Sequence, residues 1–232
     1  MKRAALALVA LGLTTFSVAP AFAASPQGAV QMKWNVAATA QLTLATNYVV
    51  ATGLQSLGAN NLQGSPAATC TSAVAETALT MTFGALTASS TLATACNYQR
   101  AVLANVVTND SLGYKLNEWL DQAPTAGITF GAYTNGFAVA PAAPASVNGV
   151  APAPGGGSIL PAGSAPSGAG PGQPGTAGIR TATAPGLPYV WASTAAATAG
   201  TNWGEDIQIN LSANQASSAA DTSYIIIQLV PN

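Results

Sequence analysis

Apolar and polar side chains alternate along the stretch from Met32 to Tyr48. Even positions carry apolar residues as far as Leu44, whereas polar residues predominate at odd positions. Because successive side chains of a β-strand point to opposite faces, this period of two predicts a strand with one buried face. At about 3.3 Å per residue the stretch would be far longer than a common strand. We therefore expect it to bend, to cross between two sheets, or to protrude.

The rest of the chain shows further strand patterns separated by turn signals, with a tight turn expected at Asn109-Asp110-Ser111. Two of these stretches, 101–108 and 223–230, are apolar on both faces and are predicted to be central strands. With no convincing helix, the pattern predicts an all-β fold, namely an Ig-like antiparallel β-sandwich of about seven or eight strands. The expected strands after the first lie at 77–86, 101–108, 112–120, 128–134, 189–191, 205–213 and 223–230.

A long Pro/Gly-rich insertion interrupts this pattern at 141–188. It holds 10 of the 15 prolines and 11 of the 23 glycines, a composition that buries little apolar surface and that we expect not to sustain a hydrogen-bonded ladder. The segment is therefore predicted to be a flexible insertion. We expect the first part of the β-sandwich at 24–140 and its final strands at 189–232.

The first residues resemble a bacterial secretory signal peptide, predicted at 1–23. Lys2 and Arg3 precede an apolar run, and Ala21-Phe22-Ala23 provides small residues for cleavage. A membrane anchor is the alternative, but the run is short and interrupted. We expect a secreted protein, extracellular or at the cell surface after transit through the periplasm, with no membrane span in the mature chain.

Charged residues are rare in this chain. Removing the predicted signal would leave four basic residues against seven acidic ones, with no basic cluster of the kind that nucleic-acid binding requires. A surface so poor in charge loses little solvation when it packs against a neighbour. We expect self-association or contact with other surface subunits, and no nucleic-acid partner.

Cys70 and Cys96 are the two cysteines of the chain. In an exported protein they are predicted to form a disulfide, which would tie the connection after the opening strand to the sandwich. With no histidine and no further cysteine, the sequence offers no zinc site.

The chain is predicted not to be an enzyme. The absence of histidine removes the usual base and triad member. The carboxylate pairs Glu118 with Asp121 and Glu205 with Asp206 could be proposed for glycoside hydrolysis, but their expected positions at strand ends and turns indicate solvated loop residues. No catalytic residue, metal site or cofactor is predicted.

The tryptophans give a second candidate function. Trp34 lies on the apolar face of the opening strand, whereas Trp119, Trp191 and Trp203 are possible exposed aromatic contacts. Exposed aromatic rings can stack on sugars or contact another subunit. A secreted ligand-binding module, most plausibly carbohydrate-binding, with a glycan as its partner, is therefore the alternative to a structural subunit.

Four short stretches resemble, in order, segments of the secreted β-sandwich subunits of the spore coat protein U and fimbrial-subunit type. They are Ala38-Thr39-Ala40-Gln41-Leu42-Thr43-Leu44, Leu79-Thr80-Met81-Thr82-Phe83-Gly84, Gly113-Tyr114-Lys115-Leu116 and Asp221-Thr222-Ser223-Tyr224-Ile225-Ile226-Ile227. The resemblance implies a non-enzymatic structural or adhesive subunit of a bacterial cell-surface assembly such as a fibre, pilus or coat, sometimes joined by exchange of a strand.

The opening stretch is the candidate for such an exchange. Its apolar side chains could fill pockets in the sheet of a neighbouring subunit, or the strand could serve its own sandwich. The residues that would carry the contact are Met32, Trp34, Val36, Leu42 and Leu44.

Overall fold

The computed structural model describes residues 31, 33, 37–46, 48–49, 53–56, 62–66, 69–70, 79–139, 154–218 and 221–232. The chain divides into two units, Met1–Val36 and Ala37–Asn232, and all the strands below belong to the second. The predicted signal peptide lies outside the described residues, as do Met32, Trp34 and Val36 of the opening stretch. Within the described ranges, no helix is long and apolar enough to cross a membrane.

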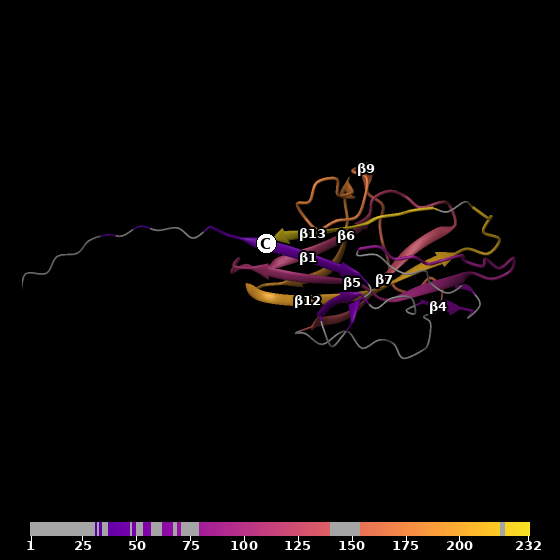
Figure 1. Ribbon diagram of the computed structural model, residues 1–232, viewed down its shortest axis with the longest axis horizontal. Coiled ribbons are helices and arrows are strands. Elements are labelled where there is room, and N and C mark those ends of the chain that lie inside the picture. Colours follow the sequence, from indigo (N-terminus) through magenta and orange to yellow (C-terminus); the bar gives the residue numbers. More distant parts are fainter. Residues whose placement is uncertain are drawn as a thin grey trace, which may run out of the picture. The chain divides into compact units, whose positions relative to one another are not determined.

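The larger sheet is built around two long strands, β5 (Thr94–Thr108) and β12 (Thr198–Leu211), which pair antiparallel along most of their lengths. The strand order is β1-β5-β12-β7-β8, and β4 also pairs with the first half of β5 (Figure 1). The remaining strands of this sheet are β1 (Ala40–Thr46), β4 (Leu62–Ser65), β7 (Ile128–Val139) and β8 (Ser158–Ile159).

The smaller sheet has three strands, with β6 (Tyr114–Leu120) between β11 (Tyr189–Thr194) and β13 (Ile225–Pro231). Its strand pairings are antiparallel, like those of the larger sheet. The predicted all-β antiparallel architecture is thus confirmed. Two short pairs complete the described strands: β2 (Tyr48–Val49) with β3 (Gly53–Ser56), and β9 (Ser164–Ser167) with β10 (Thr181–Thr183).

Both sheets contribute to a single core cluster. Tyr98 and Ile207 of the larger sheet and Tyr114 and Leu116 of the smaller sheet are fully buried in it. The alternation within β6 explains which of its side chains enter the core, because Tyr114, Leu116 and Leu120 have the same parity and so point to one face. The apolar periodicity of these strands therefore selects the side chains that hold the two sheets together.

Residues 158–163, here called the closing segment, link the two sheets on one side of this core. β8 pairs with β7 of the larger sheet, and the Leu160 N–H donates to the Phe130 carbonyl at 2.9 Å. Three residues later the Gly163 N–H donates to the Leu120 carbonyl of β6 at 2.8 Å, and the Leu120 N–H donates to the Pro161 carbonyl at 2.9 Å. Leu160 is buried between these contacts.

The predicted turn after β5 is confirmed. The Gly113 N–H donates to the Asp110 carbonyl at 3.1 Å, and Gly113 has φ of +86°. A Cβ at Gly113 would lie 2.1 Å from the Thr194 carbonyl oxygen, so this position accepts only glycine.

The predicted Cys70–Cys96 disulfide is also confirmed, with the two Cα atoms 5.7 Å apart. Cys96 lies on β5, and Cys70 forms an isolated β-bridge with Leu86. The bond therefore ties the connection after the opening strand to the larger sheet.

Three strand predictions were wrong. The opening strand begins at Ala40 and ends at Thr46, so it is an ordinary strand and not one that runs on through Tyr48. Residues 79–86 form no strand; Met81 and Phe83 still pack on the core. β13 pairs with β6 alone among the described strands, so it is an edge strand and not a central one.

The Pro/Gly-rich segment contradicts the expectation that it sustains no ladder. In its described part, 154–188, β8 joins the larger sheet and β9 pairs with β10. The strands are only two to four residues long, so the glycines and all the prolines except Pro166 of β9 lie outside them. We give the name strap to residues 164–183, which run from β9 to β10.

Candidate functional site

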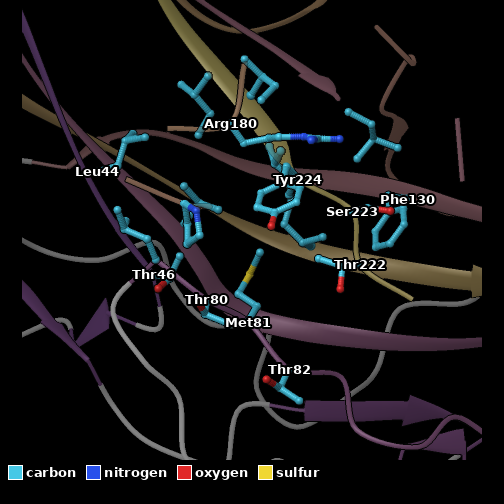
Figure 2. A pocket seen from close by; sticks show the side chains of 18 of the residues that line it. Leu44, Thr46, Thr80, Met81, Thr82, Phe130, Arg180, Thr222, Ser223 and Tyr224 are labelled. Atoms are coloured by element: carbon cyan, nitrogen blue, oxygen red, sulfur yellow. The ribbon is translucent and has the colours of Figure 1, made fainter. Parts of the chain in front are cut away.

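A groove opens between β1 of the larger sheet and β13 of the smaller sheet, on the side of the core opposite the closing segment. It has a volume of about 610 Å³, and we call it the seam groove (Figure 2). One wall is the end of β1 at Leu44–Thr46, and the other is the stretch Asp221–Ile227 that leads into β13. Its floor consists of core side chains from both sheets: Val102, Leu120, Phe130, Ile207 and Ile209.

Residues 79–84 form part of the rim of the seam groove. The Phe83 ring makes edge contacts with the rings of Tyr98 and Phe130, with centroids 5.7 and 6.3 Å apart. The alternation in this stretch therefore does place Met81 and Phe83 on the core. The strand itself does not form: Leu79 has a left-handed φ of 59°, and residues 79–84 lie in none of the described strand pairings.

The strap forms the opposite part of the rim, where an ion pair between the partly exposed Arg180 and the fully buried Asp121 fixes it. The Arg180 guanidinium contacts Asp121 Oδ2 through Nη2 at 2.9 Å and Nε at 3.0 Å, and it also donates to the Gly168 carbonyl. The same guanidinium lies 5.3 Å from the centre of the Tyr224 ring, and Figure 2 shows the two side chains side by side. Asp121 Oδ1 accepts from the Tyr224 N–H at 3.1 Å. Arg180 therefore joins the strap to the start of β13.

The tip of the strap contacts β1 through the side chain of Gln173. Its Oε1 accepts from the Leu44 N–H at 2.8 Å, and its Nε2 donates to the Leu44 carbonyl at 2.6 Å. In an antiparallel ladder the N–H and C=O of one residue point to the same edge. Leu44 therefore directs both groups away from β5, and Gln173 satisfies both at the outer edge of β1.

Four carboxyl groups expected in solvated loops are buried instead. Glu118, Asp121 and Glu205 have no exposed surface, and Asp206 is 1% exposed. Glu118 lies within β6 and Glu205 within β12, so neither lies at a strand end. In β6 the alternation explains the burial, because Glu118 has the parity of Leu116 and Leu120. In β12 both faces are buried from Gly204 to Leu211, so Glu205 and Asp206 are buried alike.

Glu118 and Glu205 form a carboxyl pair between the smaller and the larger sheet. Burial raises the pKa of Glu118 to about 7, although its hydrogen bond with Glu205 works in the opposite direction. Burial also raises the pKa of Glu205 well above its ordinary value, and the charges of Glu118 and Asp206 raise it further. Neither carboxyl has another hydrogen-bond partner among the described residues. Such a pair holds a proton at neutral pH, and both carboxyls are fully buried.

The predicted exposed aromatic contacts are wrong for two of the three tryptophans. Trp119 is 2% exposed and Trp191 is 6% exposed. Trp119 points to the face of β6 opposite that of Leu116 and Leu120. The segment at Gly163 covers that face, because a Cβ on Gly163 would lie 2.8 Å from the Trp119 ring. Trp203 is partly buried, and its Nε1 donates to the Tyr114 hydroxyl at 2.8 Å.

The structure places only two of the five predicted exchange residues. Leu42 and Leu44 lie on β1, which pairs with β5 of the same chain. Met32, Trp34 and Val36 lie outside the described residues. For Leu42 and Leu44 the structure thus agrees with the alternative in which the strand serves its own sheet.

The residues that sequence analysis missed are Gln173, Arg180 and the pair Glu118 and Glu205. Strand parity could have placed Glu118 in the core, but not Glu205, because β12 is buried on both faces there and its register shifts between Glu205 and Ile207. Gln173 and Arg180 lie 129 and 59 residues from Leu44 and Asp121, and no local pattern signals such distant contacts. Among the described residues, no group of three or more His, Cys, Asp or Glu side chains is placed to hold a metal ion.

The chain was compared with known protein families, curated proteins and solved structures. No family model, no curated protein and no solved structure matches the chain.

Proposed function

We propose that this protein is a non-enzymatic structural subunit of a bacterial cell-surface assembly, built as an Ig-like sandwich that accepts an extended apolar segment of a neighbouring copy in its seam groove. The observation that carries the proposal is the seam groove itself, which exposes the core between two edge strands. Extended segments bind such sites by adding to a strand edge and placing alternate side chains in pockets. The disulfide and the signal-like N-terminus support an extracytoplasmic location.

β13 supports this role because it combines an apolar sequence with an edge position. Its first residues, Ile225–Ile227, line the groove and are only partly buried. Natural proteins usually protect edge strands with charges, prolines or covering loops, since a free edge invites pairing with another chain. An apolar edge strand beside an open groove fits a subunit that pairs with a neighbour.

The occupant we propose is the segment before β1, where Met32, Trp34 and Val36 alternate with polar residues. This segment precedes the start of β1, whereas the groove is lined by the end of β1. Asn109 Nδ2 donates to the Ala37 carbonyl, and the Thr39 N–H donates to Asn109 Oδ1, at the start of β1. The groove begins at Leu44, four residues along the strand, about 13 Å from Ala40. A neighbouring copy can place its own segment before β1 in this groove, and the chain does not then have to fold back along β1.

The carbohydrate-binding alternative loses its named residues. Trp119 and Trp191 are buried, and Trp203 is partly buried and hydrogen-bonded to Tyr114. The stacking platform on which that hypothesis depended is therefore not formed by these three side chains.

Deletion of residues 24–36 tests the proposal. The variant should keep the Cys70–Cys96 disulfide and a cooperative unfolding transition, because the unit Ala37–Asn232 contains all the described strands. Electron microscopy and analytical ultracentrifugation should show fibres or oligomers for the full mature chain and monomers for the variant. Unchanged assembly of the variant would overturn the proposed occupant, and a monomeric mature chain would overturn the proposed function.

A further inference from the structure

The strap spans the seam groove from one sheet to the other. Its base is held near β13 by Arg180, and the Tyr224 hydroxyl adds a hydrogen bond to the Ala169 carbonyl. Its tip reaches β1 through Gln173. The strap residues Pro171, Gly172, Pro174 and Ile179–Thr181 line the groove between these two points.

The two attachments differ in strength. Arg180 makes charge-assisted contacts with a fully buried carboxylate, whereas Gln173 makes two neutral hydrogen bonds at a partly exposed edge. Charge-assisted hydrogen bonds are roughly twice as strong as neutral ones. The tip should therefore detach before the base does.

The shape of the tip also favours its detachment from β1. The Thr176 N–H donates to the Gln173 carbonyl, which closes a tight turn at residues 173–176. Gly175 at this turn has φ of +83° and an open space where a Cβ would lie. Below the tip, the Arg180 N–H donates to the Gly170 carbonyl at 2.7 Å. The turn presents Gln173 at the end of a closed loop, which can move as one piece.

We propose that the strap is an autoinhibitory guard of the seam groove, in which the Gln173 amide imitates one residue of an added strand and blocks the outer edge of β1. A strand that joins this edge must bond to the same N–H and C=O of Leu44 that Gln173 occupies. Leu44 is also part of the groove wall, so Gln173 blocks the strand edge that forms this wall while the groove itself stays open. This inference rests on the proposed function, because it concerns the regulation of the same site.

The consequence is that the strap slows assembly without preventing it. An incoming segment binds only the fraction of molecules whose tip has detached, so its apparent association rate scales with that fraction. Removing the Gln173 amide should raise the fraction without altering the groove walls.

The test uses the full mature chain at low concentration and a fluorescent synthetic peptide with the sequence of residues 31–39. Stopped-flow anisotropy should show that Gln173→Ala binds the peptide at least about tenfold faster than the unaltered chain. Amide hydrogen exchange should show faster exchange at Leu44 in this variant. Gln122→Ala is the matched control, because Gln122 is exposed and does not line the groove; it should bind at the unaltered rate.

Gln173→Glu provides a second variant of nearly the same size. Its carboxylate cannot donate to the Leu44 carbonyl, so this variant should also bind faster. Equal peptide association rates for the unaltered chain and both variants would overturn the guard and leave the proposed function standing. If no variant binds the peptide, the proposed function fails and the guard fails with it.

Discussion

The closing segment crosses from the larger to the smaller sheet on one side of the core, and the strap crosses on the other. The closing segment uses main-chain hydrogen bonds to Phe130 and Leu120 and buries Leu160 beneath them. The strap uses side chains, namely Arg180 at its base and Gln173 at its tip. Main-chain bonds are fixed by the path of the chain, whereas a side chain can leave its partner while the backbone stays in place. The difference indicates a permanent closure on one side and a releasable one on the other.

The largest expected effect concerns the base of the strap. Arg180→Met leaves the fully buried Asp121 carboxylate without its cation. We expect the free energy of unfolding to fall by about 3 to 4 kcal/mol, near the lower end of the cost of breaking a buried pair on one side, because the Arg180 side chain is 22% exposed. Denaturant unfolding measures this loss.

A double variant provides the control for that measurement. Asp121→Asn combined with Arg180→Met removes both charges and should lose less stability than Arg180→Met alone. Equal losses in the single and the double variant would mean that the charge pair does not hold the strap base.

Leu160→Ala tests the opposite side of the core. Leu160 is 4% exposed, and its removal should leave a cavity beneath the closing segment. We expect a loss of about 3 kcal/mol in the free energy of unfolding. Ile159→Ala changes the preceding residue, which is 49% exposed, and should cost less than about 1 kcal/mol. Similar losses for the two variants would contradict the buried role of Leu160.

The buried carboxyl pair of Glu118 and Glu205 joins the two sheets, so its protonation should affect the free energy of unfolding of the whole core. Glu118 has its pKa raised from 4.5 to about 7 in the folded protein, so the folded state binds this proton more tightly than the unfolded state does. Its contribution to stability is complete below pH 4.5 and is lost as the pH rises toward about 7. We expect the free energy of unfolding to fall by about 2 kcal/mol between about pH 5 and about pH 7.

Glu118→Gln removes this titration and should reduce the slope over the same interval, while the buried Glu205 carboxyl, whose pKa is also raised, keeps part of it. Denaturant unfolding at a series of pH values compares the variant with the unaltered chain. Parallel curves would show that the Glu118 carboxyl is not the source of the slope.

Strand parity predicts much of the fold, but it does not predict how the closing segment and the strap cross between the two sheets. The alternation in 112–120 predicts the buried face of β6, and the same parity places Glu118 in the core. The alternation in 205–213 predicts one buried face for β12, but both faces are buried from Gly204 to Leu211. Apolar residues on both faces correctly indicate the central position of β5 but fail for β13, because β13 exposes one edge to the seam groove. Composition does not predict the contacts of the strap. Its glycines and prolines indicate turns, but they do not indicate the distant partners of Arg180 and Gln173. Contacts between residues far apart in the sequence decide these features.

The smallest expected effect concerns the start of β1, the outer strand on the releasable side. The Asn109 side chain holds the Thr39 N–H at 2.6 Å and the Ala37 carbonyl at 3.0 Å, and both contacts are exposed. Asn109→Ala should therefore cost only about 1 kcal/mol in the free energy of unfolding. The remaining bonds to the Thr39 carbonyl, from the Asn109 N–H and Thr108 Oγ1, should keep β1 paired with β5. Amide hydrogen exchange should accelerate at Thr39 but not at Leu160, and Ser111→Ala in the neighbouring exposed turn should change neither rate. Faster exchange at both Thr39 and Leu160 would mean that the two sides of the core open together, and the distinction between a permanent and a releasable closure would be lost.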